Sequence, residues 1–505
     1  MTIAATAALP RIVDTSRVQS LIASSLSQAL VRPVKVRSIS VAVLPYPAVR
    51  LHGVEIGEDP AFGAGPFARL DAADLRLKLW SLLRGHVEFT TLVLERPTIT
   101  VMQNSDGRWN FVTLGTARET ASGPRGPRTG GPAVASAALV SRIIVHHGLI
   151  AHEMRREDGT ALRQRLEDVE GTLSPRAGRL GFAGSARAMP TDLGVKVTEG
   201  TLGLSGARTL NDAGVRARIE LDGQSIHPLT VALLGGEPAV TGAITGRLDL
   251  SGTVGRPRAA GEVELRDATV TRTSSACPEP RSRALALATV KASVRWDDGQ
   301  LVLQPLTTGI GQGSVTTKLV ASAPPPAHVE LSDLVLKGIP LDRVLVGFLC
   351  HGYAVTGPLD LTATLTFSPS DPARTLSGTG RFSIGAGKII GARALALVGD
   401  VVHGGSALEF DSIAGSYEIR NGVVTTRDLA YASRALRAMA RGDYAIATGQ
   451  MNVDVVLDHG RGMLLAKLTG PAESPAVRVA PATVRRRIEP ERVERGFREL
   501  LKKFP

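Results

Sequence analysis

Apolar and polar residues alternate along most of this chain. The pattern is clearest in four stretches: Asp74–Trp80, Gly246–Val254, Thr362–Phe367 and Asn452–Asp458. Successive side chains of a β-strand point to opposite faces of its sheet, so a period of two predicts strands with one apolar and one wet face. The pattern therefore predicts a mostly β protein.

Helical spacing is confined to a few short stretches. Apolar residues recur at helical spacing in Asp14–Leu30, where Thr15 or Ser16 can act as the cap and Pro33 blocks continuation. Further helices are expected near residues 226–235, 341–350 and 484–504. The last is basic and amphipathic, so it can lie on an anionic bilayer or pack on its own domain.

An internal repeat occupies the second half of the chain. Ala239–Gly242 and Ala354–Gly357 both read AVTG, and the same spacing pairs Leu221 with Leu336 and Ile226 with Leu341. Further along, Val290–Leu306 resembles Ile413–Leu429. A repeat of this kind favours an extended, stacked architecture.

The predicted helices are too few to cover the apolar side of so much sheet. An apolar sheet face must be covered, so either sheet packs on sheet, or the sheet curls into a trough that stays open for an apolar ligand. The pattern alone leaves both arrangements open.

Composition and charge narrow the class of partner. Hydrophobic residues make up 43% of the 505 residues but aromatic residues only 4%, and the net charge is +12. A basic protein can bind nucleic acid or an anionic membrane. No stretch interleaves aromatic with basic residues, so a stacking surface for nucleic acid is not expected, and membrane contact is favoured.

The two cysteines, Cys277 and Cys350, lack the spacing of a zinc site. They can form a disulfide in an oxidising compartment, but two separate buried thiols are the expected arrangement.

Catalytic motifs are not found in the sequence, so we expect no enzyme activity, cofactor or metal. Gly309–Gly313 (GIGQG) lacks the βαβ context of a dinucleotide loop and is interpreted as a strand bend. His146, His147 and His152 cluster, but adjacent strand positions face opposite ways and form no single site without a bulge.

Several stretches resemble the AsmA family. The N-terminal ones are Arg32–Val36, Val49–Gly57, Glu58–Phe67, Leu92–Pro97 and Ser105–Phe111, and the C-terminal ones are Glu418–Leu429, Arg441–Met451 and Leu468–Val479. The most specific is Ser105–Phe111 (SDGRWNF), a turn followed by Trp and Asn. Together they span residues 32 to about 481.

This resemblance implies an envelope protein that handles phospholipid and supports outer-membrane biogenesis. Family members face the periplasm from an inner-membrane helix and carry a β-groove with an apolar floor, which favours the trough. No stretch here reaches the roughly 18 apolar residues of a span. Ile3–Leu9 looks like the end of a longer apolar helix, so the anchor is expected to be truncated or absent in this chain.

The resulting prediction is an extended, curved antiparallel β-groove with a few short helices. Its expected parts are an N-terminal helical segment (1–31), a β-domain (32–114), a Gly/Pro-rich linker (115–135), a repeated groove body (136–482) and a basic C-terminal helix (483–505). The residues expected to line the groove are Leu75, Leu77, Leu248, Leu250, Leu365 and Val455. Those expected to contact a membrane are Arg485, Arg486, Arg487, Phe497, Leu501 and Phe504.

Phospholipid or another acyl-chain lipid, a membrane surface and other envelope proteins are the expected partners; nucleic acid is not. The alternative is a scaffold of outer-membrane assembly whose β-structure is closed and carries no lipid. A groove lined with aliphatic side chains and open at its ends separates the two.

Overall fold

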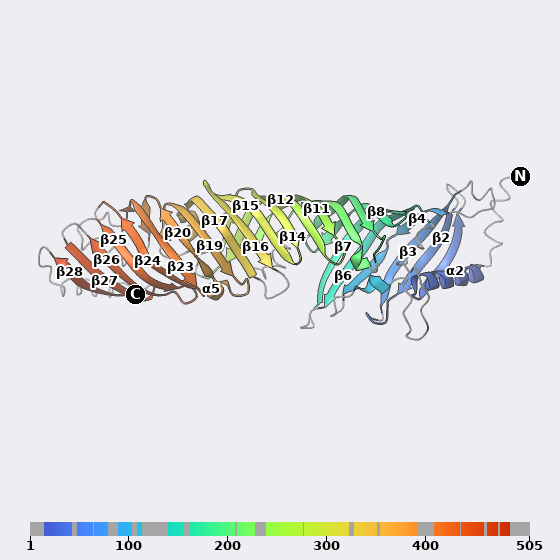
Figure 1. Cartoon of the computed structure of the whole chain (residues 1–505), viewed down its shortest axis with the longest axis horizontal. Coiled ribbons are helices and arrows are strands. Elements are labelled where there is room, and N and C mark those ends of the chain that lie inside the picture. The colour runs from blue at the N-terminus through green and yellow to red at the C-terminus, as the bar shows by residue number, and fades with distance from the viewer. Residues whose placement is uncertain are drawn as a thin grey trace. The chain divides into compact units, whose positions relative to one another are not determined.

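The computed structural model describes residues 15–42, 48–63, 65–78, 89–103, 109–113, 140–155, 161–207, 210–227, 239–275, 277–322, 328–350, 354–390, 409–434, 436–458, 462–472 and 475–484. β-Strands dominate: hydrogen bonds join 25 strands in one mixed sheet and three short strands in another (Figure 1). The predicted mostly β fold is confirmed. Contacts divide the chain into unit 1 (Met1–Ser225 and Thr245–Gly261) and unit 2 (Ile226–Ile244 and Glu262–Pro505).

Unit 1 holds one long helix and ten complete strands among the described residues. They are α2 (Thr15–Leu30), β1 (Val34–Ala42), β2 (Ala48–Gly57), β3 (Pro66–Leu77), β4 (Phe89–Glu95), β5 (Thr98–Gln103), the 3₁₀ turn η2 (Asn110–Thr113), β6 (Arg142–Arg155), β7 (Ala161–Arg176), β8 (Arg179–Met189), β9 (Leu193–Gly203), η4 (Leu210–Asp212) and β10 (Gly214–Gly223). Strands β11 (Ala239–Gly252) and β12 (Pro257–Thr273) contribute to both units.

Unit 2 continues as a series of hairpins with short helices. Its elements are β13 (Ser282–Ala286), β14 (Val290–Asp297), β15 (Gln300–Ile310), β16 (Gly313–Ser322), β17 (His328–Pro340), the π-helix η5 (Asp342–Phe348), β18 (Ala354–Val355), β19 (Pro358–Phe367), α5 (Pro372–Thr375), β20 (Ser377–Ile384), β21 (Gly387–Ile390), β22 (Glu409–Phe410), β23 (Ser412–Arg420), β24 (Val423–Ala432), β25 (Arg437–Ala445), β26 (Gln450–Asp458), β27 (Gly462–Pro471) and β28 (Ala476–Val484).

Two pairings make the sheet mixed rather than wholly antiparallel. β6 runs parallel to β4 along Arg142–His146 and parallel to β5 along Leu149–Met154. Two parallel strands can be joined only by a long crossover connection. The residues between Thr113 and β6 form this connection. The predicted linker at 115–135 falls in this connection, outside the described residues, so that domain boundary stays a prediction.

β-Bulges recur in the long strands. Register shifts interrupt the pairing of β6 with β7, β14 with β15, and β16 with β17. His147 in β6, Asp168 in β7 and Asp333 in β17 have φ between 50° and 52°. A bulge bends its strand and increases the local twist, so curvature is built into the hairpins.

The sequence repeat is a structural repeat. β11 corresponds to β18 and β19 at the offset of 115 residues that the sequence predicts. The Ile226 N–H donates to the Gly242 carbonyl in the first copy, and the Leu341 N–H donates to the Gly357 carbonyl in the second. The turns Asp298–Gly299 and Asn421–Gly422 both have positive φ at two successive residues, as tight hairpins require.

Helix α2 covers the apolar face of the first strands. It begins and ends within one residue of the predicted helix. Ala23, Leu26 and Leu30 pack on a buried cluster from β1–β3, in which Val34 is 7% and Leu51 4% exposed. This part of unit 1 is therefore a closed core.

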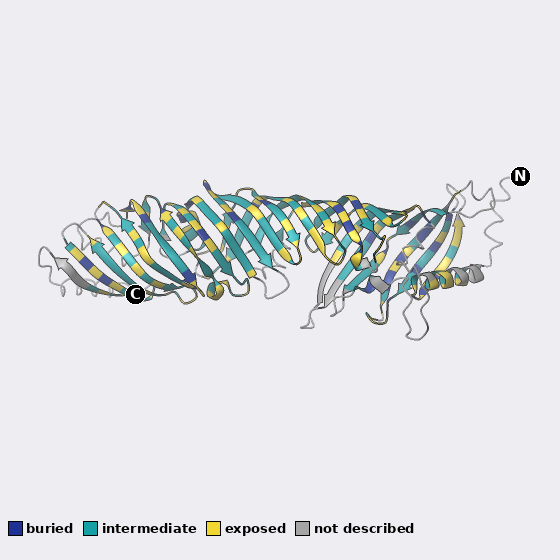
Figure 2. Cartoon of the chain, viewed as in Figure 1, coloured by how far each residue is buried: buried dark blue, intermediate teal, exposed yellow. Residues whose placement is uncertain are grey.

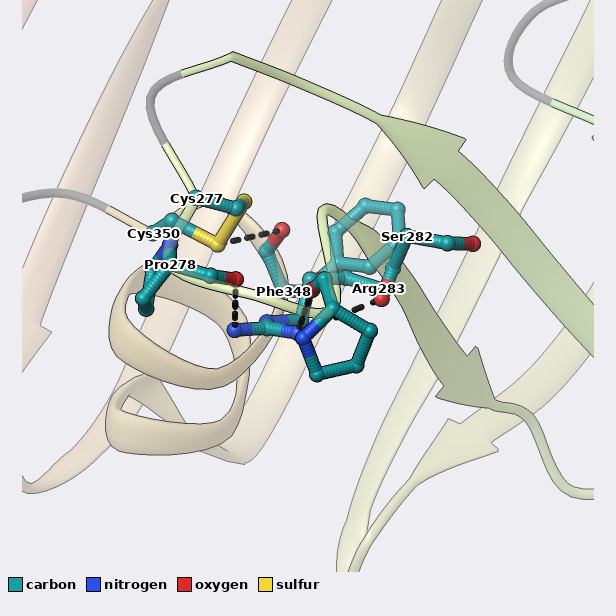
Figure 3. Close-up of a disulfide and its surroundings, with 7 residues drawn as sticks. Cys277, Pro278, Ser282, Arg283, Phe348 and Cys350 are labelled. Carbon is teal, nitrogen blue, oxygen red and sulfur yellow. Dashed lines mark hydrogen bonds between the residues drawn. A yellow bond between two sulfur atoms is a disulfide. The ribbon is translucent and has the colours of Figure 1, made fainter.

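A disulfide joins Cys277 to Cys350, so the expectation of two separate thiols is wrong. The segment after β12 and the end of η5 meet at the bond, with the two Cα atoms 5.2 Å apart (Figure 3). The Arg272 guanidinium lies 5.9 Å from the Phe348 ring centre, and Arg283 donates to the Pro278 carbonyl. The cysteines lie 73 residues apart in sequence, and only the pairing of the strands between them brings them together.

Candidate functional site

One face of the unit 2 sheet is apolar across many strands. Directly paired residues share a face, and the register gives a continuous row: Leu331, Leu365, Gly378, Ile419, Val424, Tyr444, Met451 and Gly470. A second row on this face is Leu429, Ala440, Val455, Ala466 and Val479. We call this surface the apolar face.

The opposite face of the same strands is polar. Thr364, Thr379, Glu418, Thr425, Asp443 and Asn452 form a paired row there. Figure 2 shows the resulting alternation of exposed and less exposed positions along these strands. A hollow of about 830 Å³ lies on this polar side of β17–β24, lined by hydroxyls together with Arg381, Glu418 and Arg427. Its lining does not suit an acyl chain, so the apolar face is the stronger candidate.

Part of the apolar face is already covered. Leu341 is the N-cap of η5 and Leu345 lies within it. Both pack with Val355, Ile389 and Phe410 of the three-stranded sheet. Together they cover the row Leu359, Ile384, Ile413 and Tyr431, where Ile384 is 7% and Phe410 3% exposed. Burial also raises the pKa of the Tyr417 hydroxyl, on the same side as Phe382. This cluster reaches only as far as β24 among the described residues.

The predicted lining residues are half-buried wherever their side chains are described. Leu365 and Val455 lie together on the apolar face of unit 2. Leu248 and Leu250 alternate with exposed Arg247 and Asp249 in β11. Leu75 lies beside the covered cluster of unit 1, paired with Val49 and Leu92. Leu77 ends β3, and its side chain lies outside the described residues.

A buried polar network begins at Arg32, just after the end of α2 in unit 1. Arg32 pairs with Glu58 at 2.6 Å, and their side chains are 2% and 0% exposed. Arg32 Nη2 donates to the Asn110 carbonyl at 2.5 Å. Asn110 Nδ2 donates to Glu58 Oε2 at 2.6 Å and to the Thr100 carbonyl at 2.8 Å. The guanidinium also lies 4.9 Å from the ring centre of Phe67.

The N-terminal sequence motifs converge on this network. Arg32, Glu58, Phe67 and Asn110 come from three different motif stretches. A fourth stretch contributes Gly57, whose carbonyl oxygen lies 3.5 Å from Arg32 Nη1. Every carboxylate oxygen of Glu58 is occupied by a protein donor. The network therefore fixes the end of α2, the β2–β3 connection and η2 relative to one another.

The AsmA family model matches residues 1–157, the region that holds this network. Residues 1–157 are an AsmA family region. The match confirms the resemblance seen in the N-terminal motifs, all of which lie within these residues. No curated protein and no solved structure matches the chain.

The AsmA match associates the protein with the cell envelope and with outer-membrane assembly. None of the described helices combines the length and hydrophobicity needed to cross a bilayer. Strand β28 continues to Val484, so Val484 belongs to a strand rather than to the expected C-terminal helix. The predicted membrane-contact residues Arg485, Arg486, Arg487, Phe497, Leu501 and Phe504 lie outside the described residues.

The AsmA region also contains the histidine cluster, and a bulge brings two of its members together. His146 Nδ1 and His147 Nδ1 lie 2.9 and 3.3 Å from the two oxygens of Glu170, and the His147 N–H donates to the same carboxylate. Burial acts to raise the pKa of Glu170, but the His147 N–H and the imidazoles outweigh it and hold the pKa below its usual value. His152 instead packs against Trp109, with ring centres 5.2 Å apart. Adjacent strand residues face opposite sides of the sheet only where no bulge intervenes. The alternation in the sequence therefore did not predict that His146 and His147 share one carboxylate.

Proposed function

We propose that this protein binds phospholipid along the apolar face of unit 2 and transfers it between the inner and outer membranes, in support of outer-membrane biogenesis. The supporting observation is the pair of apolar rows through Leu365 and Val455, which continue beyond the cluster under η5. Their side chains are mainly aliphatic and are half-buried or buried, a lining that acyl chains can share without competing hydrogen bonds.

Two further observations agree with an envelope setting. The AsmA match associates residues 1–157 with it. The disulfide between Cys277 and Cys350 suits an oxidising compartment such as the periplasm. We therefore propose a periplasm-facing protein associated with the inner membrane. In this proposal it acts as a carrier, without a catalytic step and without nucleic acid.

The experiment places one charge on each face of β19. Leu365→Asp puts a carboxylate on the apolar face, and Thr364→Asp, one residue away, puts it on the polar face. We expect both variants to fold and only L365D to lose transfer of labelled phospholipid between vesicles, because an exposed acyl site can keep the carboxylate wet while the charge repels the chain.

The scaffold alternative gives a different result. In a closed core, L365D would bury an unpaired charge and unfold the domain. Unfolding of L365D together with loss of transfer, or transfer unaffected by L365D, would contradict the proposal.

A further inference from the structure

Exposed apolar side chains gather at one place on the polar face of unit 2. Met439 in β25 is 59% exposed, and Leu465 and Met463 in β27 are 44% and 40% exposed. The register places Met439 opposite Val456 of β26, and Val456 opposite Leu465. We call Met439, Val456, Met463 and Leu465 the outer apolar patch.

The side chains of the outer apolar patch do not belong to the apolar face. The neighbouring Ala440, Val455 and Ala466 lie on the apolar face of the same strands, so β25–β27 carry apolar side chains on both faces at this point. A strand with one wet face carries polar residues there, as Thr362 and Thr364 do in β19. A cluster of exposed apolar side chains marks a surface that binds something.

Charged rows lie on either side of the outer apolar patch, and together they hold more basic than acidic residues. One row pairs Arg441 with Asp454, Asp454 with Lys467 and Lys467 with Arg478. On the other side Arg437 pairs with Asp458. These rows hold four basic and two acidic side chains, and Asp454 is shared between Arg441 at 3.8 Å and Lys467 at 3.9 Å.

The end of β28 lies beside the outer apolar patch. Val484 ends β28 opposite Gly462, next to Met463 of the outer apolar patch. Arg485, Arg486 and Arg487 follow in the sequence. Apolar side chains surrounded by cationic ones match the interface of an anionic bilayer, where the apolar groups enter the headgroup boundary and the cations meet lipid phosphates.

We infer that the outer apolar patch docks this protein on an anionic membrane surface. The inference rests on the proposed function only in that a lipid carrier must meet a bilayer. It places membrane contact on strands β25–β27, on the face opposite the lipid-binding rows. Methionine side chains suit such a contact because they adapt to an irregular surface.

Flotation of the full-length protein with vesicles tests the inference. The probes are phosphatidylcholine vesicles with and without phosphatidylglycerol. Because Met439 and Leu465 are exposed, Met439→Gln with Leu465→Gln should leave folding intact. We expect this double variant to bind the anionic vesicles about tenfold more weakly, from loss of two inserting side chains.

Two further variants separate the contributions. Val423→Gln removes an exposed valine of unit 2 (40% exposed) that lies outside the patch, and it should bind like the unaltered protein. Arg441→Gln with Lys467→Gln should weaken binding to anionic vesicles alone and reduce its dependence on salt.

Unchanged vesicle binding by M439Q/L465Q would overturn the inference. So would a change of oligomeric state in that variant with vesicle binding intact, because the patch would then be a protein interface. Lipid bound to the same purified samples is measured in parallel. A protein free of lipid whose vesicle binding still depends on Met439 and Leu465 would contradict the proposed function and leave the docking surface standing.

Discussion

The ion pair between Arg32 and Glu58 is deeply buried, with side chains that are 2% and 0% exposed. Removing one partner of such a pair leaves an uncompensated charge in the interior, a change that typically costs about 3–5 kcal/mol. The hydrogen bond from Asn110 Nδ2 to Glu58 adds to this cost, because Asn110 would lose this acceptor if Glu58 moved. The network therefore makes the N-terminal region sensitive to single substitutions.

We expect Arg32→Met to lower the free energy of unfolding by about 3–5 kcal/mol, measured by urea denaturation. The matched control is Arg96→Met, which removes an exposed pair with Asp71 (69% and 61% exposed) and should cost about 1 kcal/mol or less. Equal effects from the two variants would show that the buried network does not stabilise the fold. The double variant R32M/E58M should lose less than the sum of the single variants, because neither charge is then left alone.

Some contacts between individual residues could not be predicted from the sequence. Arg32, Glu58 and Asn110 were recognisable as parts of family motifs, but nothing in their spacing indicated that they meet. His146 and His147 share Glu170 only because His147 adopts φ 50° at a bulge, which a strict alternation rule forbids. The outer apolar patch did leave a signal in the sequence: Val455–Leu457 and Met463–Ala466 break the alternation with three and four consecutive apolar residues.

At the scale of elements, the hairpins follow the sequence closely. The strand patterns, the Asn-Gly and Asp-Gly turns and the helix before Pro33 all lie where local preferences put them. The parallel pairing of β6 and the disulfide depend on contacts between distant segments, and local patterns do not encode these.

The turn between β23 and β24 provides a test of this local control. Gly422 has φ 74°, and a side chain there would meet the Ala373 carbonyl of α5. Gly449 has a similar φ of 67°, but a side chain there would meet open space. We expect Gly422→Ala to destabilise unit 2 by about 1–3 kcal/mol more than Gly449→Ala, measured by thermal denaturation. Equal costs would mean that α5 does not hold this turn.

The disulfide should hold η5 against the sheet. Replacing both cysteines, Cys277→Ser with Cys350→Ser, is expected to lower stability by about 2–4 kcal/mol, since the bond restrains the unfolded chain. Hydrogen exchange should increase at η5 and at the segment after β12. Reduction of the unaltered protein should reproduce the effect, and reductant should not affect the double variant. Identical exchange in oxidised and reduced protein would contradict this role.

At the scale of the whole molecule, the two units differ in how their apolar sheet faces are covered. The first strands of unit 1 carry a closed core under α2. Among the described residues of unit 2 the covered cluster reaches β24, while the apolar rows continue through β28. The sequence predicted the excess of apolar sheet over helix, but it could not say which rows η5 and α2 cover, because covering depends on how each helix folds back on its strands.

Mass spectrometry of lipids that copurify with the intact protein tests the central claim most directly. The apolar rows through Leu365 and Val455 are mainly aliphatic and are half-buried or buried, so acyl chains should remain bound during purification in the absence of detergent. The account predicts phospholipid in stoichiometric amounts with the folded protein. A folded protein purified from membrane-containing cells that carries no lipid would contradict it.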